Sequence, residues 1–275
     1  MRISTFAATA LLGVGLLIAG CQKSDNNEQE MSNNDNETMT ETQSSEEVPV
    51  NTLSDAEKEE GWQLLFDGEN PSEHWRGYCQ DGFPEKGWAV EDNALKVVGS
   101  GAGEAGGGGD IITKNKYGNF ELKLDWKVEK GGNSGILYLA EEQCGENGEA
   151  IWKSAPEMQI LDNENHPDAR LGENGNRQAG SLYDMIPADP QNANPYGEWN
   201  HVRILVYQGT VAHFQNGEKV LEYHLWTDDW KDMVANSKFA DYPGFVDVAK
   251  EGYIGLQDHG NDVWFRNIKV KKMTN

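Results

Sequence analysis

The segment from residue 119 to residue 128 constrains the fold more than any other, because it alternates apolar and polar side chains without a fault. Its apolar side chains all share one parity: Phe120, Leu122, Leu124, Trp126 and Val128. Successive side chains of a β-strand point to opposite faces of the sheet. The segment is therefore predicted to be a half-buried antiparallel strand.

Two other segments are typical of β-hairpins. Residues 88–98 carry Asp92-Asn93 at their centre, and residues 210–223 carry Asn216-Gly217, a pair that favours a tight two-residue turn. Further strand candidates are residues 62–66, 110–113, 134–139, 157–161, 180–184, 199–207, 252–258 and 262–270. Helical pattern is confined to residues 54–60 and 227–236.

The last strand candidate changes its apolar face partway along. Val263 and Phe265 share one parity, whereas Ile268 and Val270 share the other. A β-bulge near Arg266-Asn267 returns both pairs to the core, because it inserts one extra residue into the strand.

These short strands, with no helix between successive ones, predict two packed antiparallel sheets. Glycine, at 31 of 275 residues, is more frequent than in an average protein and agrees with many turns. We therefore predict an all-β fold, a jelly-roll sandwich, in which residues 58–273 form one domain.

The amino terminus is typical of an export signal. Arg2 precedes an apolar run that ends at Ala19-Gly20-Cys21, so residues 1–20 are predicted to be a signal peptide and Cys21 a lipidation site, in resemblance to the bacterial lipoprotein box. The alternative, a transmembrane anchor, would need roughly 20 apolar residues, and this run is shorter. Residues 21–57 are polar and acidic and are predicted to be a disordered tether.

This amino terminus predicts an exported bacterial lipoprotein, on the outer membrane or the cell surface, held by the lipid on Cys21. The start Cys-Gln-Lys-Ser-Asp also resembles a surface-export signal of Bacteroidetes lipoproteins, and periplasmic or surface orientation stays open.

The net charge of −23, from 46 acidic and 23 basic residues, argues against nucleic acid or an anionic lipid surface as the partner. Residues 101–106 match the glycine spacing of a dinucleotide-binding loop. That motif needs a following helix, whereas three more glycines and the strand candidate 110–113 follow here. No nucleotide cofactor is expected.

Cys79 and Cys144 are the other two cysteines. An exported chain meets an oxidising compartment, so they either form a disulfide or stay as two separately buried thiols. A catalytic thiol is not expected, because neither cysteine has a histidine nearby in the sequence.

Several strand candidates carry polar side chains that need partners. Glu157 and Gln159 share one face of their strand and can line a ligand groove together, as can Asn133 and Tyr183 from other segments. The alternative is an ion pair of Glu157 inside the sheet, for example with Arg266 or Arg203.

The loop 162–170 follows that strand and offers His166, an imidazole that can transfer a proton near neutral pH, and Asp162, a ligand for a hard divalent metal ion. Near the carboxyl terminus, Gln257 adds an amide and His259 adds a second imidazole. Trp199 is a candidate platform for a sugar ring, with a place in the core as the alternative.

Taken in order, the motifs resemble the 3-keto-disaccharide hydrolase family over essentially all of residues 58–273. They are Gly61-Trp62 through Gly68, Trp88 through Leu95, Tyr117 through Glu121, Asn133-Ser134-Gly135-Ile136, Glu157-Met158-Gln159-Ile160-Leu161-Asp162, Gly197-Glu198-Trp199-Asn200, Asn216-Gly217 and Gly255 through Ile268. The resemblance implies a concanavalin-like jelly roll, frequent lipoprotein export, and a substrate that is a sugar already oxidised at carbon 3.

The reaction that the resemblance implies is elimination across carbons 1 and 2 followed by hydration, a net hydrolysis. We expect His166 or Glu157 as the base, Arg266 or a divalent cation near Asp162 at the enolate oxygen, and Asn133, Gln159, Tyr183, Trp199, Gln257 and His259 in substrate binding. Two other functions stay open: a non-catalytic carbohydrate-binding lipoprotein, and a retaining glycosidase acting on unoxidised glycosides.

Overall fold

A computed structural model describes residues 48–103, 106–145 and 149–274, all within one compact unit of the chain. The predicted signal peptide 1–20, the lipidation site Cys21 and most of the predicted tether lie outside the described residues. Among the described residues, no helix is long and apolar enough to cross a membrane.

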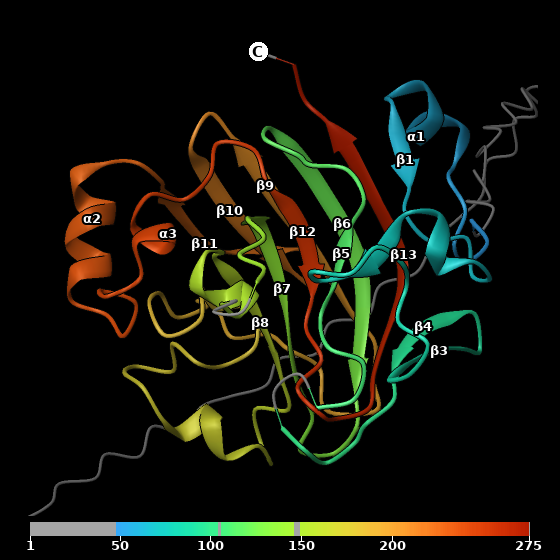
Figure 1. The fold of residues 1–275 in the computed structure, drawn as a ribbon, viewed down its shortest axis with the longest axis horizontal. Helices are drawn as coiled ribbons and strands as arrows, with labels where there is room; N and C mark the ends of the chain where they lie inside the picture. Colours follow the sequence, from blue (N-terminus) through green and yellow to red (C-terminus); the bar gives the residue numbers. More distant parts are fainter. Residues whose placement is uncertain (1–47, 104–105, 146–148, 275) are drawn as a thin grey trace, which may run out of the picture. The chain divides into compact units, whose positions relative to one another are not determined.

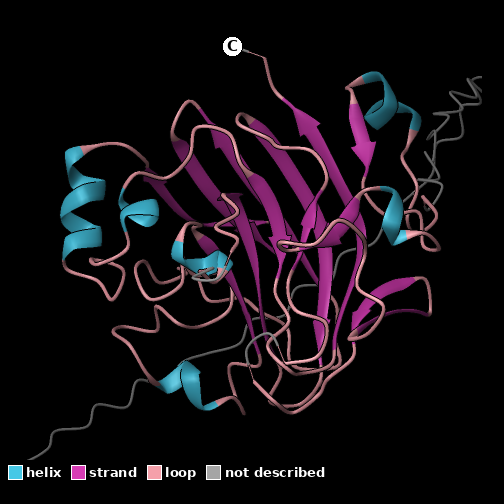
Figure 2. Ribbon diagram, viewed as in Figure 1, coloured by secondary structure: helices cyan, strands magenta, loops and turns pink. Residues whose placement is uncertain are grey.

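The described strands form two antiparallel sheets (Figure 2). The larger contains β1 (Trp62–Leu64), β3 (Trp88–Glu91), β4 (Ala94–Val97), β6 (Phe120–Val128), β9 (Asn200–Tyr207), β10 (Thr210–Gln215), β11 (Glu218–His224) and β13 (Val263–Lys272). The smaller contains β2 (Trp75–Gly77), β5 (Ile111–Thr113), β7 (Asn133–Ala140), β8 (Glu157–Leu161) and β12 (Tyr253–Leu256).

The larger sheet runs in the order β11, β10, β9, β6, β13, β4, β3, with β1 also paired to β13. The smaller sheet runs in the order β2, β5, β12, β7, β8. Strands that are distant in the sequence are thus neighbours, and the predicted all-β, concanavalin-like jelly-roll sandwich of two antiparallel sheets is confirmed.

The helices are short, and Figure 1 shows α2 and α3 at one side of the sheets and α1 at the other. They are α1 (Asp55–Glu59), α2 (Asp228–Ala235) and α3 (Pro243–Val246), together with the 3-10 helices η1 (Pro71–Glu73), η2 (Ile151–Lys153) and η3 (Pro167–Arg170). The first two α-helices coincide with the two predicted helical segments. Each begins at a hydroxyl N-cap, Ser54 for α1 and Thr227 for α2.

The local features predicted from periodicity are present. Asp92 and Asn93 both adopt positive φ, 51° and 59°, in the turn between β3 and β4, and Asn216-Gly217 turns between β10 and β11. The pairing of β13 with β6 shifts register between Arg266 and Lys269, which is the predicted bulge.

The segment 180–184 was predicted as a strand, and this prediction is wrong. Only Leu182 bridges to a strand, at Met158 of β8, and the residues around it form turns. Gly180 and Asp184 have positive φ, 85° and 59°, which lies outside the extended region of a regular strand.

The core lies between the two sheets. The larger sheet contributes Phe120, Leu122 and Trp126, and the smaller contributes Tyr138 and Met158, all at 2% exposure or less. Burying such side chains stabilises the fold by roughly 1.5–3 kcal/mol each.

A chain of polar groups crosses this core. His213 is fully buried and its Nδ1 lies 3.0 Å from the carbonyl oxygen of Gly180, so Nδ1 carries the proton and donates it. Tyr138 then donates its hydroxyl to His213 Nε2 over 2.8 Å and accepts the hydroxyl of Tyr223 over 2.7 Å. Burial lowers the pKa of His213 from 6.5 to about 4.

The folded structure begins before residue 58. Asn51 is buried and forms a reciprocal pair with Asn267, in which each backbone N–H donates to the other's Oδ1 over 2.7 Å. Glu57 forms an ion pair with Lys269 of β13. The predicted tether 21–57 is therefore too long at its carboxyl end, because residues from 51 onward are tied to β13.

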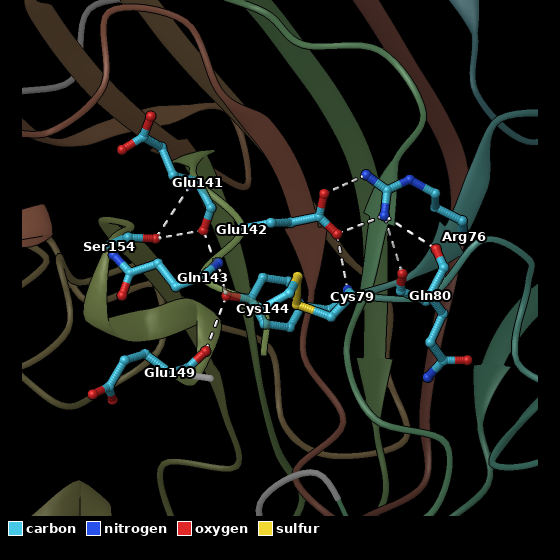
Figure 3. Close-up of a disulfide and its surroundings, with 11 residues drawn as sticks. Arg76, Cys79, Gln80, Glu141, Glu142, Gln143, Cys144, Glu149 and Ser154 are labelled. Carbon is cyan, nitrogen blue, oxygen red and sulfur yellow. Dashed lines mark hydrogen bonds and ion pairs between the residues drawn. A yellow bond between two sulfur atoms is a disulfide. The ribbon is translucent and has the colours of Figure 1, made fainter. Parts of the chain in front are cut away.

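Cys79 and Cys144 form a disulfide, the first of the two expected alternatives, with their Cα atoms 5.6 Å apart. Figure 3 shows how the surrounding side chains brace it. Arg76 binds both carboxylate oxygens of Glu142 over 2.6 Å, and Glu142 also accepts the N–H of Cys79. The bridge thus joins the turn after β2 to the loop after β7, which leads into η2.

Candidate functional site

The pairing of β7 with β8 presents polar side chains on the outer face of the smaller sheet. Met158 and Ile160 point into the core between the sheets, so Glu157 and Gln159 point to the opposite face. Both are nevertheless buried, at 6% and 1% exposure, because loops cover this face. The prediction that these two side chains share one face of a strand is confirmed.

These side chains lie at a cavity of about 100 Å³. Six of the predicted site residues line it, from segments far apart in the sequence: Asn133, Glu157, Gln159, Tyr183, Gln257 and His259. Trp152, Lys238 and Phe239 complete the wall. The structure therefore brings together most of the predicted binding residues around Glu157.

Space for the Glu157 carboxylate depends on Gly135, the residue of β7 opposite Gln159. A Cβ atom on Gly135 would lie 2.6 Å from Cδ of Glu157, too close for any side chain. The amide of Gln159 is best satisfied with its nitrogen 3.3 Å from Oε1 of Glu157 and 3.1 Å from the carbonyl oxygen of Ser134. The carboxylate thus lies flat on the sheet with an amide donor beside it.

Lys238 is the cation of the cavity wall, and no motif in the sequence predicts it. The residue as a whole is exposed, yet its Nζ lies 4.0 Å from the centroid of the Tyr183 ring and 5.1 Å from that of Phe239. Partial loss of hydration lowers the pKa of Lys238, while the negative charges of Asp184 and Glu157 oppose this effect. A lysine in such surroundings gives up its proton more readily than one in water.

Tyr183 is held in place by a hydrogen bond to Asp168, which is in turn paired with Arg177. Its hydroxyl donates to Oδ2 of Asp168 over 2.9 Å, and Oδ1 of Asp168 accepts from Arg177 over 2.8 Å. Arg177 also donates to Asp184 over 2.5 Å. Burial, followed by the hydrogen bond to Asp168, raises the pKa of Tyr183, so it stays a neutral phenol whose ring supports Lys238.

His166 does not line the cavity, but its ring contacts that of His259, which does, with the two ring centroids 6.4 Å apart. Its Nδ1 accepts the backbone N–H of Asp168 over 3.1 Å, so the proton of the neutral ring is on Nε2. Burial lowers the pKa of His166 and favours this neutral form. In this arrangement His166 can donate a hydrogen bond but has no free lone pair for a base, which favours Glu157 among the two predicted bases.

His259 is positioned by its neighbour Asp258. One carboxylate oxygen of Asp258 accepts the N–H groups of Gly107, Gly108 and Gly109 over 2.9–3.2 Å. The backbone amides of this glycine-rich segment therefore bind a carboxylate of the protein itself, and this binding fixes the chain that carries His259.

Asp162, the predicted metal ligand, is occupied by its own loop. Its Oδ1 accepts the N–H groups of Glu164 and Asn165, and its Oδ2 accepts those of Gly131 and the Asn165 side chain. These bonds lower the pKa of Asp162 despite its burial. The residue fits a loop-stabilising role and not the predicted metal site.

Within the described part of the chain, one group of three potential ligand side chains comes close together, Cys79, Glu142 and Cys144. Its two sulfur atoms are joined in the disulfide and its carboxylate is bound by Arg76, so this group does not fit a divalent cation either.

Arg266 and Trp199 do not lie with the other predicted residues. Arg266 belongs to β13 of the larger sheet, where its Nε donates to Asp125 over 3.2 Å and its guanidinium lies 4.0 Å from the centroid of the Trp199 ring. Neither residue lines the cavity, so the structure does not bring the predicted enolate-binding Arg266 and the predicted sugar platform Trp199 together with the other predicted residues. The guanidinium is already bound between an acid and an indole ring.

Comparison with known proteins gives consistent results. The profile of the 3-keto-alpha-glucoside-1,2-lyase-like domain matches residues 61–271. A protein named 3-keto-disaccharide hydrolase, from Bacteroides thetaiotaomicron, is 48% identical over 98% of this chain and 99% of its own length.

Two solved structures are similar to this chain in both sequence and fold. A crystal structure from Parabacteroides distasonis, titled as a glycosyl hydrolase, is 33% identical and covers 82% of this chain and 100% of its own, with a TM-score of 0.70. A second from the same organism, titled in the same way, is 28% identical and covers 72% of this chain and 99% of its own, with a TM-score of 0.54.

Proposed function

The chain belongs to the 3-keto-alpha-glucoside-1,2-lyase-like domain family, and from this membership we propose that it is a carbohydrate hydrolase acting on glycosides already oxidised at carbon 3. The observation that carries the proposal is the convergence of Glu157, Lys238 and His259 with three amide side chains in one cavity. The carboxylate of Glu157 can accept a proton, Lys238 is a cation, and the amide side chains donate hydrogen bonds, all in the same cavity.

The chemistry follows from the ketone. A carbonyl at carbon 3 acidifies the hydrogen on carbon 2, so a base removes that proton and the electron pair forms an enolate. The enolate then expels the oxygen on carbon 1, which takes a proton and leaves as an alcohol. Water adds across the new double bond between carbons 1 and 2, and the net result is hydrolysis. The paired carboxylates of ordinary glycosidases are not needed.

Glu157 is proposed as the base. Its carboxylate faces the cavity, and it lies flat on the sheet because Gly135 leaves the space free. His166 is the less suitable candidate because its Nδ1 is already bonded to a backbone N–H. Such proton transfer contributes typically about 10²–10⁴-fold to the rate.

The ammonium group of Lys238 is proposed to stabilise the negative charge that develops during elimination. It takes the role expected of Arg266, which lies on the other sheet and binds Asp125. Asn133, Gln159, Gln257 and His259 offer the hydrogen-bond donors that orient the hydroxyl groups and the enolate oxygen of the sugar. Since Asp162 does not fit a metal ligand, no step here depends on a bound ion.

The decisive experiment uses methyl 3-keto-glucoside in deuterated water. Elimination followed by hydration places solvent deuterium on carbon 2, which mass spectrometry detects after rapid borohydride reduction and return of the hydroxyl hydrogens to water. Free 3-keto-glucose without enzyme controls for spontaneous exchange. Cleavage without deuterium on carbon 2 would contradict the mechanism, and cleavage of the unoxidised methyl glucoside would indicate a retaining glycosidase instead.

The same assay tests the base. Glu157→Gln should lower kcat by about 10²–10⁴-fold with an unchanged melting temperature. Glu222→Gln, on an exposed position of β11, is the matched control and should behave as the wild type. Wild-type turnover by Glu157→Gln would remove Glu157 from the mechanism.

Export as a lipoprotein remains a proposal that rests on the sequence from Arg2 to Cys21. In a bacterial host, Cys21→Ser should abolish labelling of the protein by radioactive palmitate and release it from the membrane fraction. Labelling of the variant at the wild-type level would refute the assignment.

A further inference from the structure

Three charged side chains next to the cavity form a cluster, the Asp168–Arg177–Asp184 cluster, although none of them lines the cavity itself. Arg177 donates from Nη1 to Oδ1 of Asp168 over 2.8 Å and from Nε to Oδ1 of Asp184 over 2.5 Å. The side chains of Asp168, Arg177 and Asp184 are 13%, 22% and 10% exposed, so water screens their charges only partly. Two carboxylates share one guanidinium, and the cluster therefore carries a net negative charge.

The ring of Tyr183 connects this cluster to Lys238. The hydroxyl of Tyr183 donates to Oδ2 of Asp168 over 2.9 Å. The guanidinium carbon of Arg177 lies 5.6 Å from the centroid of the ring, and the ammonium nitrogen of Lys238 lies 4.0 Å from the same centroid. The two cations are therefore within about 10 Å of each other, a distance over which salt screens charges only in part. The cluster is close enough to influence the charge of Lys238.

The charge of Lys238 depends on groups from several parts of the chain. Partial burial lowers the pKa of Lys238, whereas Asp184 and Glu157 raise it. In addition, Arg177 lowers this pKa and Asp168 raises it. The charged or titratable groups around the ammonium are Glu157, Asp168, Arg177, Tyr183 and Asp184, His259 in the cavity wall, Glu173 in a groove that Lys238 also lines, and Lys153 at the ring of Trp152.

We propose that the Asp168–Arg177–Asp184 cluster is a set of positioning residues for the reaction. Through its net negative charge the cluster keeps Lys238 in the ammonium form, and through Asp168 it fixes the ring on which that ammonium lies. This inference rests on the proposed function, in which the ammonium group stabilises the enolate. It names the groups outside the cavity that make this ammonium available.

The two signs of charge in the cluster predict opposite effects on Lys238. Asp168→Asn keeps an oxygen that can accept the Tyr183 hydroxyl but removes a negative charge, so the ammonium becomes less stable. Arg177→Gln removes a positive charge, so the ammonium becomes more stable. Both substitutions break the ion pair between Asp168 and Arg177, and a purely structural disturbance would therefore act in one direction.

The first test follows the ammonium group itself by NMR. In protein labelled at the ε carbon of lysine, the chemical shift of that carbon reports protonation, and Lys238→Met identifies the signal of Lys238. Asp168→Asn should lower the pKa of Lys238 by about half a unit or more, and Arg177→Gln should raise it by a similar amount. Asp184→Asn is a second acid variant and should act like Asp168→Asn.

The matched control is Asp229→Asn, exposed on the first turn of α2. It makes the same change in net charge as Asp168→Asn and should leave the pKa of Lys238 at the wild-type value. Shifts of the same sign in the acid variants and in Arg177→Gln, or no shift in any of them, would overturn the inference.

The second test carries the effect to the reaction. For methyl 3-keto-glucoside, kcat/KM should fall at alkaline pH as Lys238 loses its proton. This fall should begin at lower pH in Asp168→Asn and at higher pH in Arg177→Gln. An alkaline fall at the same pH in the wild type and both variants would overturn the role of the cluster in the reaction.

The outcomes separate this inference from the proposed function. If the wild type cleaves 3-keto-glucosides but the variants do not shift the pKa of Lys238 in opposite directions, the inference is overturned and the proposed function stands. If the shifts appear but the wild type cleaves no 3-keto-glucoside, the proposed function fails, and the role of the cluster in the reaction fails with it.

Discussion

The Cβ position of Gly135 lies 2.6 Å from Cδ of Glu157, so the carboxylate occupies the space that any side chain at residue 135 would need. Gly135 does not adopt a positive φ, and alanine is therefore compatible with its backbone. The glycine is required by the neighbouring carboxylate and not by the conformation of β7.

Gly135→Ala should therefore inactivate the protein while it stays folded. The methyl group would push the Glu157 carboxylate off the sheet, and displacement of a catalytic group by about 1 Å can cost about 10²-fold in rate. The measurement is kcat on a 3-keto-glucoside together with circular dichroism. Gly82→Ala, where an added Cβ meets nothing within 4 Å, is the control. Full activity of Gly135→Ala would disprove the role of this space.

Arg266→Met should affect stability and leave turnover unchanged. The substitution removes the hydrogen bond to the buried carboxylate of Asp125 and the contact with Trp199, and the expected loss is about 1–3 kcal/mol of unfolding free energy. Urea denaturation and kcat measure the two effects separately. A large fall in kcat with unchanged stability would return Arg266 to the catalytic site.

Stability should depend on pH through His213. Its pKa is about 4 in the folded protein, against 6.5 for the unperturbed group, so the unfolded chain binds more protons between these values. As pH falls from 6.5 to 4, the wild type should lose about 3 kcal/mol more unfolding free energy than His213→Gln. Parallel pH profiles of the two proteins in urea denaturation would show that His213 does not contribute.

Removal of the disulfide should destabilise the fold. Cys79 and Cys144 are 65 residues apart, so the bridge strongly restricts the unfolded chain. The double variant Cys79→Ser, Cys144→Ser should lose about 2–4 kcal/mol of unfolding free energy, and reduction of the wild type should give the same result. An unchanged denaturation midpoint would mean that the braces around Glu142 suffice without the bridge.

Much of the sandwich could be predicted because its signals are local. The alternation in β6, the Asn216-Gly217 turn and the bulge at Arg266 each depend on residues a few positions apart. The segment 180–184 was mistaken for a strand because its apolar pattern gave no indication of the positive φ at Asp184.

Strand parity explains only part of the predicted site. Parity placed Glu157 and Gln159 on one face, but it could not say which of two outer faces Arg266 occupies, since both are polar. Lys238 reaches the cavity through the tertiary packing of the segment after α2, which leaves no periodic trace. The hydrogen bonds that occupy Asp162 could not be predicted, because the sequence around a carboxylate bound by backbone N–H groups does not differ from that around one that binds a cation.

From Glu157 to Ile160, the residues of β8 that face the cavity and those that face the interior alternate one by one. Substitutions at Glu157 or Gln159 can therefore alter chemistry without repacking Met158 and Ile160 against the opposite sheet. Because cavity-facing and core-facing residues of β8 are separate, substrate specificity can change by substitution on one face while the packing of the two sheets is kept. The same separation is useful in protein engineering.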